Sequence, residues 1–177
     1  MFAYDIVAAI APAITADNDN PQDHAIWERI DTALRDLRAR RRHAIRILDL
    51  SCGDGHWLIR TARRARALGF TAIEGRGVDR DPAAIAGATR AAQAHSDLAI
   101  GLTFEVGSLG DVLEEERDNA CDIVLCLGDA LDRVGPGAMP LVARALIDCA
   151  HTTVIATIGR GGHRRCVVEA LPIDTPR

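Results

Sequence analysis

Apolar and polar positions alternate along this chain in blocks that predict β-strands separated by helices. Short apolar runs, typical of strands buried in a parallel sheet, occupy residues 45–50, 72–78, 98–106, 121–127 and 152–158. Apolar residues at helical spacing lie before and between these runs, in residues 22–41, 58–65, 82–94 and 138–150. We therefore predict an α/β fold with a doubly wound, mostly parallel sheet, whose ligand site lies at the carboxyl ends of the strands.

The segment before the first predicted strand forms a separate helical region. An apolar stripe within residues 2–14 predicts a short helix, and turn-forming residues at 17–21 separate it from the next helix. We expect an N-terminal helical cap over residues 1–44 and a ligand-binding α/β domain over residues 45–177.

Composition narrows the classes of function. The 177 residues are 48% hydrophobic, which is enough for one domain with a substantial core. The net charge of −4 gives no general affinity for nucleic acid or for an acidic membrane. All 21 basic residues other than histidine are arginines, so no lysine can form a Schiff base or grip a phosphate in a P-loop.

The cysteines and the start of the chain bear on its location. The five cysteines form no C-x-x-C pair, and their odd number indicates reduced thiols. The apolar residues 1–14 lack the basic segment of a signal peptide and are too few to span a bilayer. We expect a cytoplasmic protein without a membrane partner.

The glycine turn, Asp49 to Gly55, carries the most information about the ligand. It joins a predicted strand to a helix, where glycine permits close approach and the helix presents free N–H groups. The carboxylates of Asp49 and Asp54 would repel a pyrophosphate and attract a cation. Leu58 stands where the dinucleotide-binding fingerprint has its third glycine, so a dinucleotide is the poorer alternative.

The ends of the other predicted strands also carry polar residues and glycines. Asp79 follows the second strand and can accept hydrogen bonds from both vicinal hydroxyls of a ribose. Ser108 follows the third strand, and Gly128 and Asp129 follow the fourth. These side chains meet at one edge of a parallel sheet.

This ordered set of motifs resembles the class I (Rossmann-like) S-adenosylmethionine-dependent methyltransferases. The resemblance rests on residues 47–55, 77–82, 107–108 and 121–128. It implies that residues 45–177 bind S-adenosylmethionine and release S-adenosylhomocysteine. The glycine turn would then hold the methionine end, Asp79 the ribose and Arg80 one side of the adenine. The implied cofactor-binding residues are Asp49, Ser51, Cys52, Gly53, Asp54, Gly55, Asp79, Arg80, Ser108, Leu109, Cys126 and Gly128.

Three positions depart from the family's pattern. Ser51 replaces the first glycine of the turn, although its hydroxyl can donate to a carboxylate. Ser108 stands where the family has an acid at the adenine edge, unless the register uses Asp111. Residues 160–177 are too few for the family's closing hairpin, so we expect an abridged sheet or one completed by a partner. An open edge strand would favour a homodimer.

The resemblance implies transfer of a methyl group to a small-molecule acceptor. A general base is needed only where the acceptor must lose a proton. Asp129 is the first candidate, because it follows the fourth strand; Asp132, His56 and His163 are others. The alternative is a non-catalytic or partner-dependent S-adenosylmethionine-binding protein.

Two further ligand classes are disfavoured by the motifs. The strand ends lack the oxygen cage of a magnesium or calcium site, and no cysteines and histidines have zinc spacing, so we expect no metal. The exit of the fourth strand lacks the Asn/Asp-Pro-Pro-aromatic motif of enzymes that methylate nucleic-acid amines. DNA is therefore not the expected substrate.

Overall fold

The computed structural model describes residues 21–95, 97–160 and 163–170. Side-chain surroundings are described up to Gly159. The helix predicted within residues 2–14 and the side chain of His163 lie outside this part of the chain.

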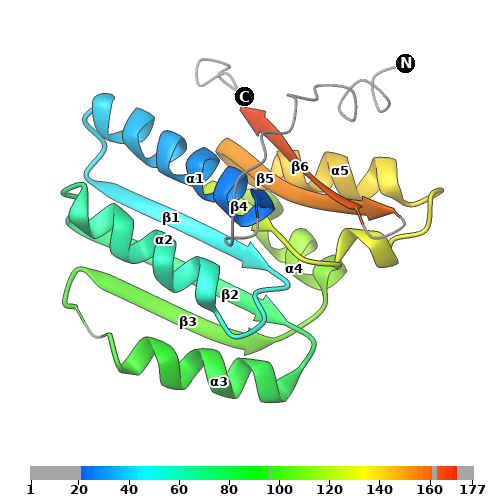
Figure 1. Cartoon of the computed structure of the whole chain (residues 1–177), viewed down its shortest axis with the longest axis horizontal. Helices are drawn as coiled ribbons and strands as arrows, with labels where there is room; N and C mark the ends of the chain where they lie inside the picture. The colour runs from blue at the N-terminus through cyan, green and yellow to red at the C-terminus, as the bar shows by residue number, and fades with distance from the viewer. Residues whose placement is uncertain (1–20, 96, 161–162, 171–177) are drawn as a thin grey trace.

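One sheet contains all the strands of the described chain, in the order β3-β2-β1-β4-β5-β6 (Figure 1). Strands β1 to β5 are parallel, and β6 runs antiparallel to β5. The strands are β1 (Ala44–Leu50), β2 (Ala72–Asp79), β3 (Ile100–Val106), β4 (Cys121–Cys126), β5 (Ala150–Arg160) and β6 (His163–Ala170). The predicted doubly wound, mostly parallel sheet is confirmed, with the chain order reversing between β1 and β4.

Helices cover both faces of the sheet (Figure 1). On one face lie α1 (Pro21–Ala39), α2 (His56–Ala67) and α3 (Pro82–Gln93); on the other lie α4 (Leu109–Glu115) and α5 (Met139–Asp148). The sequence did not predict α4, which has only seven residues and ends in the 3-10 turn η2 (Glu116–Asp118).

Strand β1 shows how the alternation of side chains divides the core into two layers. Ile45 and Ile47 pack with α1 and α2, whereas Leu48 and Leu50 pack with α4 and α5. Asp49 therefore turns toward α2, and the backbone N–H of Leu58 donates to its carboxylate. Helix α1 shares this core through its buried apolar stripe, Ile26, Ile30, Ala33, Leu34 and Leu37.

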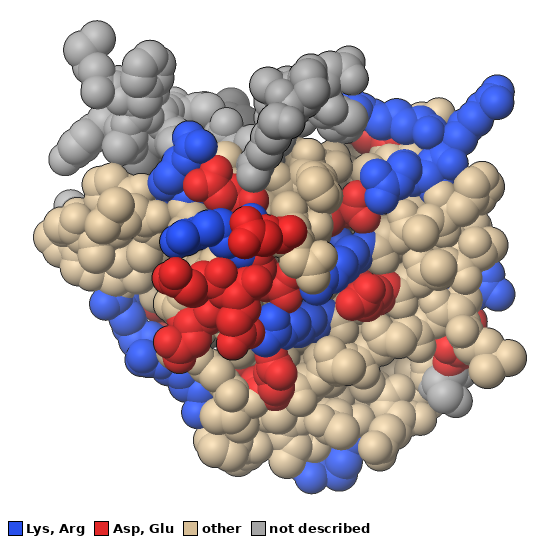
Figure 2. Space-filling model, turned by 180° about the vertical axis from the view of Figure 1, so that it is seen from behind, with Lys and Arg blue, Asp and Glu red and all other residues tan. Residues whose placement is uncertain are grey.

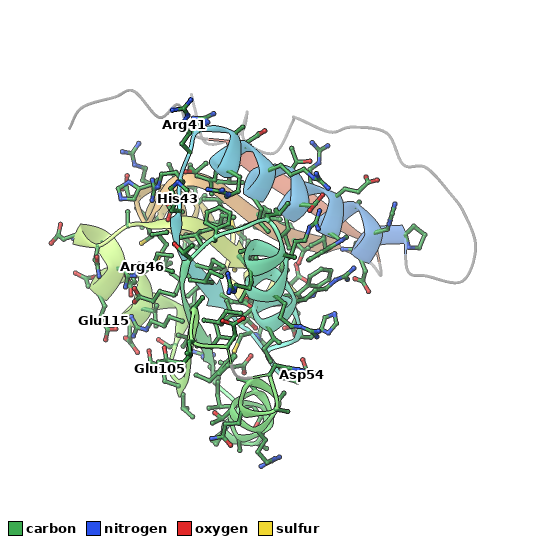
Figure 3. All side chains as sticks on the ribbon, turned by 90° about the vertical axis from the view of Figure 1, so that its left-hand side faces the viewer. Arg41, His43, Arg46, Asp54, Glu105 and Glu115 are labelled. Carbon is green, nitrogen blue, oxygen red and sulfur yellow. The ribbon has the colours of Figure 1, made fainter. Side chains whose placement is uncertain are left out.

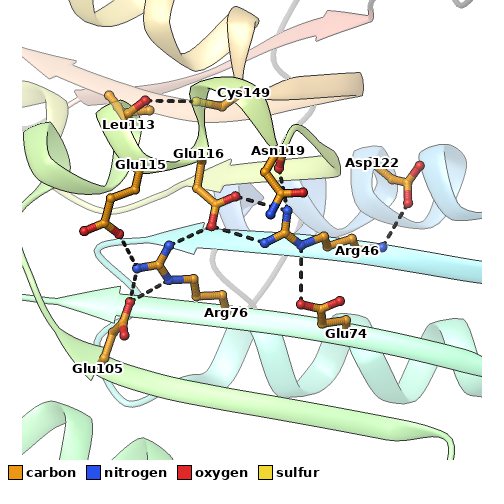
Figure 4. A network of polar contacts seen from close by, with 10 residues as sticks. All are labelled: Arg46, Glu74, Arg76, Glu105, Leu113, Glu115, Glu116, Asn119, Asp122 and Cys149. Carbon is orange, nitrogen blue, oxygen red and sulfur yellow. Dashed lines mark hydrogen bonds and ion pairs between the residues drawn. The ribbon is translucent and has the colours of Figure 1, made fainter.

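An ion-pair network, formed by Arg46, Glu74, Arg76, Glu105, Glu115 and Glu116, lies on the α4 side of β1, β2 and β3. Figure 2 shows acidic and basic side chains gathered on this face, and Figure 4 shows their contacts. Oε1 of Glu116 accepts from Arg76 Nη1 at 2.6 Å and from Arg46 Nη2 at 3.2 Å. The arginine stems cover the sheet while their guanidinium groups meet carboxylates from β2, β3 and α4.

Candidate functional site

The glycine turn is fastened to the neighbouring strand β2. The backbone N–H groups of Ser51 and Cys52 donate to the carbonyl oxygen of Val78 at 2.8 and 3.0 Å. Ser51 has φ 68°, a left-handed conformation that costs a residue with a side chain about 1 kcal/mol. Such a backbone conformation favours glycine, which is the residue that the resemblance implies at this position.

Two glycines are required by close packing beneath the turn. A Cβ atom at Gly55 would lie 2.8 Å from Phe104 Cε1 and 2.9 Å from Ala88 Cβ. At Gly77 it would lie 2.6 Å from Phe104 Cδ1. Gly53 differs, because a Cβ atom there would meet nothing within 4 Å. The open side of the turn at Gly53 is therefore where a ligand can approach the backbone.

Asp79 connects the turn to the start of α3. Its Oδ2 accepts from Gly53 N–H and its Oδ1 from Asp81 N–H, both at 2.9 Å. Asp81 in turn caps α3 by accepting from Ala83 N–H at 2.9 Å. Asp79 is only half-buried, and a carboxylate has about four lone-pair sites, so it retains acceptors for the hydroxyls of a ribose.

Asp49 lies beneath the same turn and is 1% exposed. Its Oδ2 has no hydrogen-bond partner among the described residues. Burial, reinforced by the charge of Asp79, raises the pKa of Asp49 to about 7, although the Leu58 N–H acts in the opposite direction. A buried carboxylate with a free oxygen and a second acid nearby suits a cationic ligand.

The two thiols beside this carboxylate are buried and stay in the neutral form. Burial, together with the charges of Asp49 and Asp79, raises the pKa of Cys52 well above its usual range. Burial raises the pKa of Cys126 to about 12, and Asp49 adds to this shift. Both cysteines are free and act here as small apolar groups rather than nucleophiles.

A cavity of about 310 Å³ opens at the carboxyl ends of the strands. It brings together four of the sequence-predicted residues, Ser51, Asp79, Arg80 and Leu109. The rest of its lining is Leu50, Val78, Gly107, Gly110, Ala130, Arg133, Val134, Gly135, Ala138 and Val142. The sequence analysis did not predict the side of the cavity formed by residues 130–142. The Gly135-Pro136-Gly137 segment could have indicated a loop at this edge of the sheet.

Ser108 does not line this cavity, because its hydroxyl caps the N-terminus of α4. It accepts from Asp111 N–H at 3.3 Å and donates to the Asp111 carboxylate at 2.7 Å. Ser108 is thus the N-cap of a helix that the sequence did not predict. Its predicted contact with an adenine stays a prediction, as does the alternative use of Asp111.

The exit of β4 supplies two acids with different roles. Asp132 accepts from Gly159 N–H at 2.7 Å and so ties this loop to β5. Asp129 remains half-exposed, and Arg133 lies 3.1 Å from its carboxylate. Gly128 has φ 84°, and its carbonyl oxygen accepts from Thr157 Oγ1 at 2.8 Å. Neither carboxylate lines the cavity, and they differ in that the Asp132 carboxylate is held by the Gly159 N–H whereas Asp129 pairs only with the exposed Arg133 among the described residues.

A larger hollow, of about 410 Å³, lies at the opposite end of β1, β2 and β3. Its buried acid, Asp122, already accepts from Arg42 Nη2 at 2.8 Å and from Arg46 N–H at 2.9 Å. It contains neither the glycine turn nor Asp79. The carboxyl edge is therefore the candidate functional site, even though the hollow at the other end is larger.

Figure 3 shows Asp54, from the glycine turn, on the other side of the sheet from Arg46, Glu105 and Glu115 of the ion-pair network.

Among the described residues, no three His, Cys, Asp or Glu side chains are grouped so that they could hold a metal ion. None of the described helices has the length and apolar character needed to cross a membrane.

Comparisons with known proteins identify related sequences and folds. The sequence model of a family described as a methyltransferase domain matches residues 42–150. No curated protein sequence matches the chain.

Two solved proteins illustrate the shared fold. Monomeric WbdD, described elsewhere as a bifunctional kinase-methyltransferase, has a TM-score of 0.64 and 18% identity over 90% of this chain. Magnesium protoporphyrin IX methyltransferase (ChlM) from Synechocystis PCC 6803, with bound SAM, has a TM-score of 0.57 and 17% identity over 90% of this chain. The match covers 39% of WbdD and 72% of ChlM, so this chain spans about two fifths of WbdD. The predicted Rossmann-like methyltransferase fold is confirmed.

Proposed function

Because the chain belongs to the methyltransferase-domain family, whose members use S-adenosylmethionine, we propose that it methylates a small molecule. The observation that carries this proposal is the pairing of an acid-lined glycine turn with a cavity of about 310 Å³ at the same sheet edge. A cavity of this size suits a small ligand. ChlM, which shares the fold, is named for a small-molecule substrate, magnesium protoporphyrin IX.

The residues of the carboxyl edge fit the cofactor. The cofactor supplies an activated methyl group on a positively charged sulfur, and the buried, unpartnered oxygen of Asp49 suits that charge. Asp79 would accept from the ribose, and Arg80 and Leu109 would flank the adenine in the cavity. The remaining proposed contacts are Ser51, Cys52, Gly53, Asp54, Gly55, Ser108, Cys126 and Gly128.

Catalysis would rest mainly on alignment and exclusion of water, because the sulfur is already a good leaving group. Asp129 would act as general base for acceptors that must lose a proton. Its half-exposed carboxylate at the β4 exit supports this role, and Arg133 would orient it. An acceptor without an acidic proton would not need Asp129.

The experiment has two stages. Calorimetric titration with S-adenosylmethionine measures cofactor binding, and Asp79→Ala should weaken it at least tenfold, while Asp36→Ala on the exposed part of α1 should not. Release of S-adenosylhomocysteine is then measured with a panel of small molecules. Absence of binding by the wild type would contradict the proposal.

A non-catalytic or partner-dependent role is the second candidate. It is favoured by Ser51, whose left-handed backbone adds strain where the family has glycine. Tight cofactor binding without turnover, on the full panel and with added cell extract, would support the non-catalytic role. Turnover that needs the extract would support the partner-dependent one.

Assembly and location complete the proposal. After β5 the described chain adds one antiparallel strand, β6, which pairs only with β5 and so leaves that edge of the sheet open among the described residues, which supports a homodimer through that edge. Sedimentation velocity would measure this. The four cysteines whose side chains are described are free and buried, which supports a cytoplasmic location.

A further inference from the structure

Three carboxylates of the described chain are almost fully buried, and one of them lacks a cationic partner. Glu116 contacts Arg46 and Arg76, and Asp122 contacts Arg42. Asp49 receives only the Leu58 backbone N–H, and its Oδ2 accepts no hydrogen bond. An unpartnered buried carboxylate oxygen is costly in a folded protein. Asp49 does not line the cavity, but it lies beneath the glycine turn, directly before the cavity residues Leu50 and Ser51, so its unpaired charge acts on that site through the turn.

The groups around Asp49 add negative charge or none. From β2, Asp79 opposes its ionisation, and from α2 the Leu58 N–H favours it. The turn contributes the neutral thiol of Cys52 and, farther out, Asp54; β4 contributes the neutral thiol of Cys126. Near neutral pH, the ligand-free protein therefore holds Asp49 partly protonated, because its pKa is raised to about 7.

We propose that Asp49 discriminates the cationic methyl donor from its product by releasing a proton when the donor's positive charge enters the site. This inference rests on the proposed function. A nearby cation stabilises the carboxylate, so donor binding and ionisation of Asp49 favour each other. In methyl transfer, the acceptor's electron pair forms the new bond to carbon and the S–C pair stays on sulfur. The site then loses one positive charge, Asp49 recovers a proton from solvent, and the product binds less tightly.

The test is calorimetric titration of the full chain with S-adenosylmethionine and with S-adenosylhomocysteine between pH 6 and pH 8. Buffers of different ionisation enthalpy report the protons released. We expect the wild type to release more protons with the donor than with the product. Its donor affinity should rise with pH, by up to about tenfold per unit below pH 7, which is the limit for one linked proton.

Asp49→Asn is the matched variant, because it keeps the shape of the side chain and cannot titrate. Both ligands carry the same amine, whose own titration is common to wild type and variant and cancels in the comparison. In Asp49→Asn the extra proton release should disappear and the donor-to-product affinity ratio should fall several-fold. Equal proton release by wild type and variant, or an unchanged ratio, would overturn the proposal.

Asp79→Asn provides a second route if Asp49→Asn does not fold. It keeps Asp49 and removes the repulsion from β2, so the proton release should shift to lower pH. Because Asp79 is also a proposed ribose contact, this titration uses ligand at concentrations high enough to saturate the weakened site. Release centred at the same pH as in the wild type would also overturn the inference. Failure of the wild type to bind either ligand would instead contradict the proposed function, so the two failures are distinguishable.

Discussion

The glycine turn and the ion-pair network place similar carboxylates in opposite situations. Asp49 is 1% exposed and Glu116 is 3% exposed. Glu116 lies between two guanidinium groups, with its Oε2 3.1 Å from Arg46 Nη1, whereas Asp49 has one backbone donor and a second acid nearby. Burial alone therefore does not identify a functional acid; the charge of its neighbours does. Glu116 is neutralised within the network, whereas one oxygen of Asp49, beneath the turn, has no hydrogen-bond partner among the described residues.

The pH dependence of stability should separate the two regions most strongly. Between pH 4 and pH 7 folded Asp49 keeps its proton while the unfolded chain has lost it, because the folded pKa is raised from 3.8 to about 7. Unfolding then releases a proton, so the contribution of Asp49 is full below pH 4 and is lost as pH rises to 7, by at most about 4 kcal/mol. Urea unfolding at several pH values measures this loss.

Asp49→Asn is the control for that measurement, since every other group titrates in both proteins. The difference in unfolding free energy between wild type and variant should change across pH 4 to pH 7 and stay constant above. Parallel curves would contradict a raised pKa at Asp49.

Glu116→Gln should destabilise the protein by about 3 kcal/mol, because it leaves Arg46 and Arg76 without their shared carboxylate. Cofactor affinity should stay within twofold of wild type, since the network lies across the sheet from the turn (Figure 3). The matched control is Glu114→Gln in α4, two residues earlier in the chain. Glu114 is 75% exposed and lies 3.7 Å from Arg117, so urea unfolding should show less than about 0.5 kcal/mol. If both variants lost the same free energy of unfolding, the buried ion pairs of Glu116 would stabilise the protein no more than the exposed pair of Glu114.

Gly55→Ala should cost about 2 kcal/mol and weaken cofactor binding. The new methyl would clash with Phe104 and Ala88 at a residue whose φ is 78°. Gly53→Ala has a similar backbone but open space around the new methyl, so its stability loss should be near 1 kcal/mol. Thermal unfolding and calorimetry of both variants test the distinction. A larger loss of stability for Gly53→Ala than for Gly55→Ala would contradict the packing argument.

The strands could be predicted from sequence because burial leaves a local pattern. All six residues of β4 are buried, and its sequence is an almost continuous apolar run. Helix α4 left no such pattern: Val112 and Leu113 are its only buried residues, and four of the five residues at 114–118, which span its end and the turn η2, are acidic. Its start depends on the Ser108 cap, which only the structure identifies.

The environment of the site acids could not be predicted, because it depends on contacts between distant segments. Glu116 meets arginines that precede it by 70 and 40 positions, and Gly53 N–H finds Asp79 26 positions later. The sequence predicted that Asp49 and Asp79 lie at one sheet edge. That Asp49 faces α2 with one oxygen unpartnered follows only from the packed strands and helices. The ligand contacts of both residues stay predictions.

Substitutions of Ser51 should change stability least among these predictions, and comparing glycine with alanine there separates backbone strain from a ligand contact. Ser51→Gly removes the side chain from a residue at φ 68° and should stabilise the protein by about 0.5 kcal/mol, since relief of strain exceeds the added entropy of the unfolded chain. Ser51→Ala keeps the strain and removes only the hydroxyl. If that hydroxyl donates to the cofactor's carboxylate, calorimetry should show both variants losing the same few-fold affinity, while urea unfolding shows a gain for glycine alone. Unchanged affinity in both would mean that Ser51 contributes strain without a ligand contact, and the turn would then depend on its acids and on backbone N–H groups alone.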